Sequence, residues 1–144
     1  MRGARMSCNC IGMALGVLIV DDNLLFLEAA RVLLEREGLR VVGVAASSAD
    51  ALRRAGELRP EVVLVDITLG GESGFDLARR LAEHHRGGAP TVILISTHAE
   101  ADFADLIADS PAAGFVPKAE LSADAIRRIV DGRAPEGTGD ARAR

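Results

Sequence analysis

The side chains that could do chemistry in this sequence follow predicted strands. They are three carboxylates, a hydroxyl and an amine: Asp21, Asp22, Asp66, Ser96 and Lys118. Three carboxylates gathered at the ends of apolar strands repel one another, and burial strengthens that repulsion. Such a cluster requires a cation, and hard oxygen ligands that leave positions for water suit Mg²⁺. A metal held by carboxylates attracts phosphate as a further ligand, so these residue types predict phosphoryl chemistry.

The amine and the hydroxyl fit the same chemistry. Lys118 provides a compact positive charge that can pair with a phosphoryl oxygen, or with Asp66 when no phosphate is bound. The Ser96 hydroxyl can donate to another oxygen. A simpler interpretation is that acids after strands only cap the helices that follow, and Asp22 fits that role. Asp66 does not, because it precedes a glycine loop, so helix capping does not explain the whole set.

An alternation of apolar strands and amphipathic helices must position these side chains. Strands are expected over residues 17–20, 41–45, 61–65, 91–95 and 113–116. Helices are expected over about 26–38, 48–57, 75–85, 99–109 and 123–131. Continuous apolar strands that alternate with helices are typical of a parallel sheet covered on both faces. Right-handed crossovers then favour a doubly wound α/β fold, in which ligands bind beyond the carboxyl ends of the strands.

The length and composition predict a single globular domain. The chain has 144 residues, of which 49% are apolar and 26% charged, a balance typical of globular proteins. We expect an irregular N-terminal extension over 1–16, a folded domain over 17–131 and a flexible tail over 132–144. The tail is too short for a DNA-binding helix-turn-helix module, which predicts a stand-alone domain.

The charge and the aromatic content argue against a nucleic-acid partner. The net charge is -4 and aromatic residues make up 3%, so the surface repels phosphate and offers little for bases to stack on. The longest apolar run, 11–20, is shorter than the roughly 20 residues that a membrane span needs. Cys8 and Cys10 are too few for a disulfide framework and indicate a reducing compartment. We therefore expect a cytoplasmic protein that contacts neither nucleic acid nor membrane.

Taken in order, the residues at the strand ends resemble the receiver domain of bacterial two-component response regulators, of the single-domain type. The resemblance covers about residues 17–131. Gly74 eight positions after Asp66, the Ile-Ser-Thr sequence that ends the fourth strand and the Gly-Phe-Val-Pro-Lys sequence around the fifth also match. The resemblance implies a flavodoxin-like, five-stranded parallel sheet of order 2-1-3-4-5 with five helices.

The same resemblance implies a phosphoacceptor and a metal site. Asp66 would be the carboxylate nucleophile that forms an acyl phosphate. Asp22 would hold Mg²⁺ directly and Asp21 partly through water, with Asp66 itself as a further ligand. The backbone carbonyl of Thr68 would complete the metal shell.

The resemblance also implies a switch and its partners. Ser96 and Lys118 would bind the phosphoryl oxygens, and Phe115 would be the aromatic switch residue that turns inward as Ser96 moves. His98 would tune the access of water to the acyl phosphate rather than act as a ligand. The phosphoryl group would come from a histidine kinase or a phosphotransfer protein, and an unidentified downstream protein would receive the signal. The chain would be a signalling domain rather than an enzyme, and a monomer or a weak phosphorylation-dependent dimer.

The sequence departs from the family pattern and leaves two alternatives open. Leu69-Gly70 stands where many receivers have proline, and Phe115 lacks the hydroxyl of tyrosine, so the switch would work by packing alone. A Mg²⁺-dependent aspartyl phosphatase or phosphotransferase usually carries a second Asp two residues after the nucleophile, where this sequence has Thr68. A degenerate receiver that only binds proteins would not require the complete set of acids.

Overall fold

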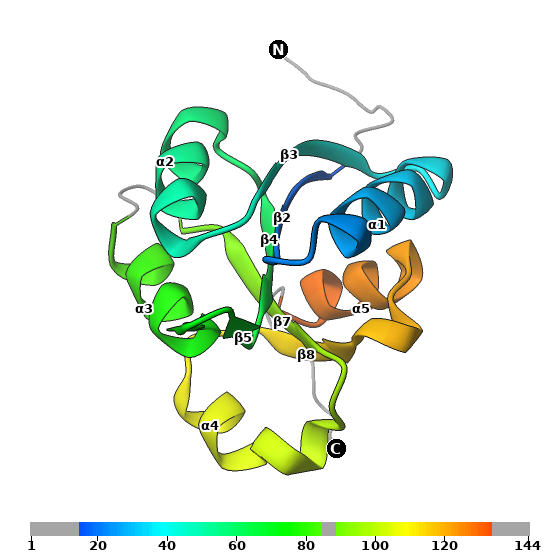
Figure 1. Cartoon of the computed structure of the whole chain (residues 1–144). Coiled ribbons are helices and arrows are strands. Elements are labelled where there is room, and N and C mark those ends of the chain that lie inside the picture. The colour runs from blue at the N-terminus through cyan, green and yellow to red at the C-terminus, as the bar shows by residue number, and fades with distance from the viewer. Residues whose placement is uncertain (1–14, 85–88, 134–144) are drawn as a thin grey trace.

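The computed structural model describes residues 15–84 and 89–133, which form a five-stranded parallel sheet with helices on both sides (Figure 1). The sheet strands are β2 (Gly16–Val20), β3 (Arg40–Ala45), β4 (Val62–Asp66), β7 (Thr91–Ser96) and β8 (Gly114–Pro117). The helices are α1 (Leu24–Arg36), α2 (Ser48–Leu58), α3 (Gly74–His84), α4 (Ala104–Asp109) and α5 (Ala123–Arg133). Four shorter elements lie among the described residues: the strands β5 (Thr68–Leu69) and β6 (Glu72–Ser73), and the 3₁₀ turns η1 (Glu100–Phe103) and η2 (Lys118–Glu120).

The strand order is β3-β2-β4-β7-β8, and every neighbouring pair in this sheet is parallel. Counting only these five strands along the chain, the order is 2-1-3-4-5, so the predicted doubly wound topology is confirmed. From β2 the chain first adds β3 on one side of it and then returns to add β4, β7 and β8 on the other. The direction of strand addition therefore reverses between β2 and β4, and doubly wound folds bind their ligands at the carboxyl ends of the strands at such a point.

Two apolar layers explain why the strands read as continuous hydrophobic runs. Val17 and Ile19 of β2 belong to the layer covered by α1 and α5, whereas Leu18 and Val20 belong to the layer covered by α2 and α3. Every residue of β2 and β4 is buried. Because successive side chains point to opposite faces, a strand covered on both faces must be apolar throughout.

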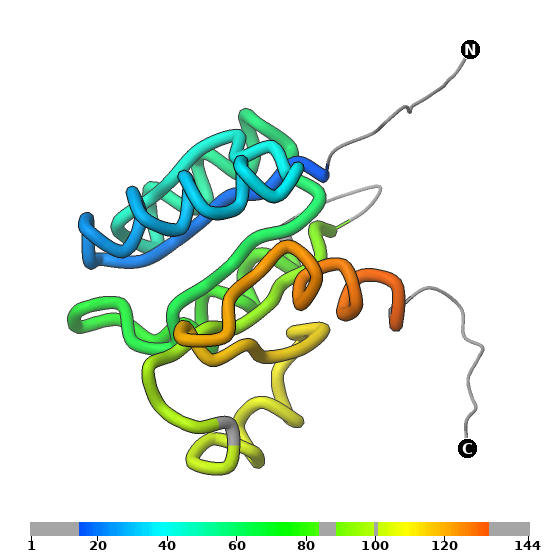
Figure 2. The backbone as a smooth tube through the Cα atoms, turned by 90° about the vertical axis from the view of Figure 1, so that its right-hand side faces the viewer, coloured from blue at the N-terminus to red at the C-terminus, as the bar shows by residue number. Residues whose placement is uncertain are grey.

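The fourth expected helix, over about 99–109, is wrong in its first half. The segment begins with η1, and α4 contains six residues, none of them buried. Phe103 and Ile107 are only partly buried against the core, too few apolar contacts to hold a long helix on the sheet. Both η1 and α4 lie at the lower edge of the molecule in two views at right angles (Figure 1 and Figure 2).

The residue that caps the first helix is not the one that the helix-capping interpretation suggested. Asn23, not Asp22, is the N-cap residue of α1, and its side chain accepts hydrogen bonds from the backbone amides of Leu25 and Phe26. Asparagine is among the best N-cap residues because its side-chain oxygen satisfies amides that have no partner in the helix. Asp22 is thereby left without a structural role at the helix end.

The end of α1 is joined to the start of α5. The carboxylate oxygen Oε1 of Glu37 accepts a hydrogen bond of 2.7 Å from the backbone amide of Ala123, and the Glu37 carbonyl accepts one from Arg127. Ser122 also caps α5, through the amide of Ala125. An acid at the amino end of a helix is favourable because free amides and the helix dipole both attract negative charge.

The predicted extension and tail fall mostly outside the described residues, as do Cys8 and Cys10. Of the extension, Gly16 already belongs to β2, and α5 includes residues 132 and 133 of the expected tail. Within 15–84 and 89–133, no helix is both long and apolar enough to cross a membrane.

Candidate functional site

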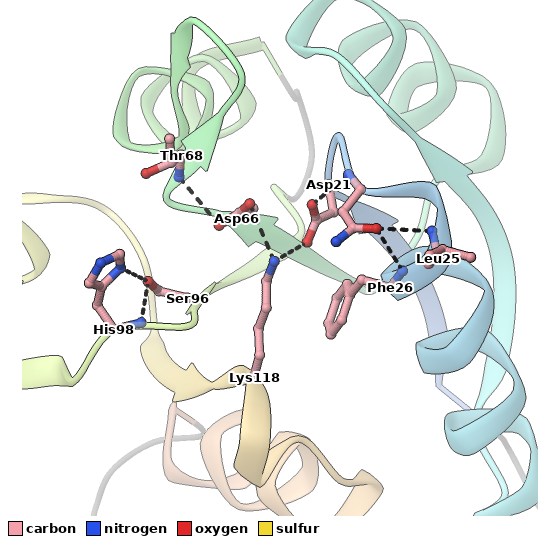
Figure 3. A network of polar contacts seen from close by, with 9 residues as sticks. Asp21, Leu25, Phe26, Asp66, Thr68, Ser96, His98 and Lys118 are labelled. Carbon is pink, nitrogen blue, oxygen red and sulfur yellow. Dashed lines mark hydrogen bonds and ion pairs between the residues drawn. The ribbon is translucent and has the colours of Figure 1, made fainter.

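Four polar side chains meet at one rim of the sheet because four parallel strands end there (Figure 3). Asp21 follows β2, Asp66 ends β4, Ser96 ends β7 and Lys118 follows β8. The register of the strands brings these residues to the same edge of the sheet, since Asp66 is paired with Ile95 and Ser96 with Pro117. The convergence predicted from the strand ends is therefore present in the fold.

The three acids lie close enough to share a cation. Oxygens of Asp21, Asp22 and Asp66 all lie within 4.8 Å of one another, and Asp21 is fully buried whereas Asp22 is exposed. Two oxygens on opposite sides of one Mg²⁺ are about 4.2 Å apart, so small movements or a bridging water bring these three onto one ion. Oδ1 of Asp21 accepts from the Asn23 amide, but Oδ2 has no hydrogen-bond partner. The donor set and this buried oxygen fit a hard divalent cation.

Asp66 is poised between its neutral and charged forms. Burial, together with the negative charge of Asp21, raises the pKa of its carboxyl from 3.8 to about 6, although Lys118 and the Thr68 amide oppose the shift. The Thr68 amide donates to Asp66 Oδ1 at 3.3 Å. A carboxylate with little solvent and few hydrogen bonds is a stronger nucleophile than one in water.

Lys118 supplies the positive charge of the site. Its ammonium lies 2.5 Å from Asp21 Oδ2 and 3.5 Å from Asp66 Oδ2. The closer contact is an ion pair with the buried Asp21 Oδ2, which has no hydrogen-bond partner besides it. The predicted pairing with Asp66 is present, but Asp21 is the nearer partner. Lys118 is also the only lysine among the 144 residues.

Ser96 is held by its own loop. Its hydroxyl accepts a hydrogen bond of 3.0 Å from the His98 amide, and the His98 Nδ1 lies 3.4 Å away (Figure 3). The His98 ring in turn meets the Phe103 ring edge to face, with centroids 5.8 Å apart. The Ser96 hydroxyl is therefore linked through His98 to Phe103 in η1.

Phe115 lies on β8, inside the core rather than among the polar groups. It is 9% exposed and belongs to the apolar cluster against which Phe103 and Ile107 are packed. The Phe115 ring therefore already lies in the inward position that is expected of a switch residue.

The glycine loop after Asp66 forms the β5–β6 hairpin, which the sequence pattern did not predict. Gly70 has a φ of 57°, which glycine adopts without strain. A Cβ atom on it would lie 3.4 Å from Asp22 Oδ2. Glu72 of the hairpin accepts a hydrogen bond of 2.9 Å from the Ser48 amide at the start of α2. The hairpin therefore lies against Asp22 and is anchored to the neighbouring helix.

One contact of the site could not be found from residue types alone. The Lys118 ammonium lies 4.4 Å from the centre of the Phe26 ring. The spacing of apolar residues placed Phe26 on the buried face of α1, and it does contact the core, although it is only partly buried. Its contact with Lys118 depends on where η2 lies relative to α1, which the local sequence does not show.

Comparison with known proteins agrees with this geometry. A sequence model of the response regulator receiver domain matches residues 17–131. Response regulator GacA of Pseudomonas viridiflava is 33% identical over 114 residues, which are 78% of this chain and 52% of that protein. A protein-glutamate methylesterase/protein-glutamine glutaminase of Myxococcus xanthus is 40% identical over 85 residues, 58% of this chain and 24% of that protein. The chain thus spans about half the length, or less, of these relatives.

A solved structure shows the same fold. The signal receiver domain of the putative response regulator NarL from Mycobacterium tuberculosis superposes with a TM-score of 0.71 at 28% identity, covering 82% of this chain and 94% of that one. With the match over 17–131 and the convergence of acids and lysine at the rim, the chain belongs to the response regulator receiver domain family of two-component systems, in which phosphorylation of an aspartate is typical.

Proposed function

We propose that Asp66 accepts a phosphoryl group from a histidine kinase or a phosphotransfer protein, in a site that holds Mg²⁺. The observation that carries this proposal is the convergence of Asp21, Asp22 and Asp66 with Lys118 on one rim. Asp21, Asp22, Asp66 and the Thr68 carbonyl would hold the ion. When bound, Mg²⁺ neutralises the negative charge that the acids and the phosphoryl oxygens bring together.

The residues of the chain divide the reaction between them. An oxygen of the Asp66 carboxylate attacks phosphorus and forms the acyl phosphate, while the bond from phosphorus to the donor nitrogen breaks and the leaving imidazole takes up a proton. Above a pH of about 6, most Asp66 is the charged nucleophile. Ser96 at the end of β7 and Lys118 after β8 would bind the phosphoryl oxygens.

The proposal is for a signalling domain rather than an enzyme. Thr68 lies two residues after Asp66, where an aspartyl phosphatase needs a general acid, and its side chain cannot serve as one. We propose that the receiver signals through contact with a downstream protein, as a monomer or a weak phosphorylation-dependent dimer. We propose a cytoplasmic location, which is consistent with the receiver family.

Phosphorylation should require both Mg²⁺ and Asp22. With a small phosphodonor such as phosphoramidate, intact-mass spectrometry should show one added phosphoryl group with Mg²⁺ and almost none after chelation. Asp22→Ala should weaken Mg²⁺ binding at least tenfold, because it removes an anionic ligand at the exposed side of the site. A titration of metal against labelling rate measures both effects. Equal labelling with and without metal would contradict the proposed site.

Phosphorylation should change the face formed by η1, α4, β8 and η2. Ser96 leaves His98 for the phosphoryl group, and His98 contacts Phe103, while α4 has no buried residue to hold it in place. Amide hydrogen exchange with Mg²⁺ and beryllofluoride should therefore change mainly over residues 96–121. Changes confined to α1 would show that the switch works through another face.

A further inference from the structure

The Lys118 ammonium is held from two sides in the metal-free site. On one side are the carboxylates of Asp21 and Asp66, and on the other is the ring of Phe26, 4.4 Å from the ammonium to its centre (Figure 3). Phe26 lies in the first turn of α1, whereas Lys118 begins η2, near the other end of the fold. A cation over an aromatic face is attracted by the ring, and more strongly where water is scarce. Lys118 is only 13% exposed.

The position of the Phe26 ring is related to which carboxylate the Lys118 ammonium contacts more closely. Asp21 and Asp66 are both buried, yet the ammonium lies 1.0 Å closer to Asp21 Oδ2 (2.5 Å) than to Asp66 Oδ2 (3.5 Å). Phe26 and Asp21 stand at the two ends of one short segment, the β2–α1 connection and the first turn of α1. The ring and Asp21 together therefore draw the ammonium toward the α1 side of the site.

This position overlaps with the proposed metal site. Asp21 Oδ2, which the ammonium contacts, has no hydrogen-bond partner, and Asp21 is one of the three acids that would surround the ion. Two cations at one carboxylate repel each other, so a metal that binds at Asp21 must compete with the ammonium for that side chain.

We propose that Phe26 is a positioning residue for Lys118: its ring holds the ammonium against Asp21 when the metal is absent and so weakens Mg²⁺ binding. The inference rests on the proposed function, since it assumes Mg²⁺ at these acids. Removing the ring leaves the ammonium easier to displace. Phe26→Leu should therefore bind Mg²⁺ two- to fivefold more tightly, the range that corresponds to a cation–π contact of about 0.5–1 kcal/mol.

The single lysine allows a direct test. Protein grown with ¹³C-labelled lysine gives the NMR signals of Lys118 alone, without chemical modification. In the metal-free protein, the Cε protons should be shifted upfield by the Phe26 ring. Phe26→Leu should abolish that shift, whereas Phe26→Tyr, which keeps the ring, should retain both the shift and the affinity for Mg²⁺. Leu25→Ala, an exposed neighbour on α1, is the control for changes in the helix itself.

The outcomes separate this inference from the proposed function. If Mg²⁺ moves the wild-type lysine signal and Phe26→Leu binds the metal more tightly, the inference holds. If Phe26→Leu keeps the same lysine shift, or the same affinity for Mg²⁺ as the wild type, the inference is overturned even though Asp66 is still labelled by phosphoramidate. If wild-type protein neither binds Mg²⁺ nor accepts a phosphoryl group, the proposed function fails, and the inference with it.

Discussion

Replacing Asp66 by asparagine should make the protein unable to accept a phosphoryl group and, at neutral pH, more stable. The first effect follows from the loss of the nucleophilic oxygen, because an amide does not form an acyl phosphate under these conditions. The second follows from the electrostatics of the site. Burial and the charge of Asp21 raise the pKa of Asp66 to about 6, so its charged form is unfavourable in the folded protein.

The pH dependence of this stability has a definite sign. Below a pH of about 4, Asp66 is protonated in the folded and unfolded chain alike and costs nothing. Between about 4 and 6 the unfolded chain loses the proton first, so the free energy of unfolding falls as the pH rises and stays lower above 6. The full loss amounts to about 1–3 kcal/mol. Asp66→Asn removes this loss, and its advantage should appear only above a pH of about 4.

Urea unfolding of wild type and Asp66→Asn from pH 3.5 to 8, without divalent metal, measures this effect. Asp102→Asn makes the same chemical change at an exposed acid of η1 and should leave the pH profile unaltered. A variant that is less stable than the wild type at pH 7.5 would show that the contact with Lys118 outweighs the cost of burying the charge. Labelling of Asp66→Asn to the wild-type level would remove Asp66 as the phosphoacceptor.

Gly74→Ala should destabilise the fold by more than about 3 kcal/mol. A Cβ atom at Gly74 would lie 2.1 Å from the carbonyl oxygen of Asp66 and 2.9 Å from the Cα of Ile67. These are backbone atoms and cannot rotate away, and the Gly74 amide is bound to the Ile67 carbonyl at 2.7 Å. Overpacking against a mobile side chain costs about 1–3 kcal/mol, so a fixed backbone should cost more.

Thermal unfolding measures the effect of Gly74→Ala, with a decrease in Tm of about 10 °C or more. Gly71→Ala is the matched control, because it adds the same atom three residues earlier and that atom meets nothing within 4 Å. A small change at both positions would show that the loop after β4 yields easily. Since the clash is with Asp66 itself, residual folded protein should also be labelled more slowly.

The strand ends could be predicted because each signal is local. A run such as Val62–Val65 is apolar throughout, which indicates burial on both faces, and parallel topology brings all carboxyl ends to one rim. From that point, the meeting of Asp21, Asp66, Ser96 and Lys118 follows without any knowledge of distances. The family resemblance added the topology and the roles.

The remaining features depend on contacts between distant segments. β5 and β6 contain two residues each, too short for any periodicity to reveal. The helix over about 99–109 is expected from the alternation of strands and helices, but the first part of this segment is a 3₁₀ turn because few of its apolar side chains contact the sheet. The preference of Lys118 for Asp21 depends on where the Phe26 ring lies.

The hydrogen bond from Ala123 to Glu37 has a consequence for synthesis on the ribosome. It spans 86 positions, so the C-terminal end of α1 reaches its final surroundings only after nearly the whole domain has been translated. β2 likewise lies between β3 and β4 and must wait for the later of the two. Nascent chains released before residue 123 should therefore expose part of the apolar layer to which α1 and α5 both contribute, the kind of surface that chaperones bind.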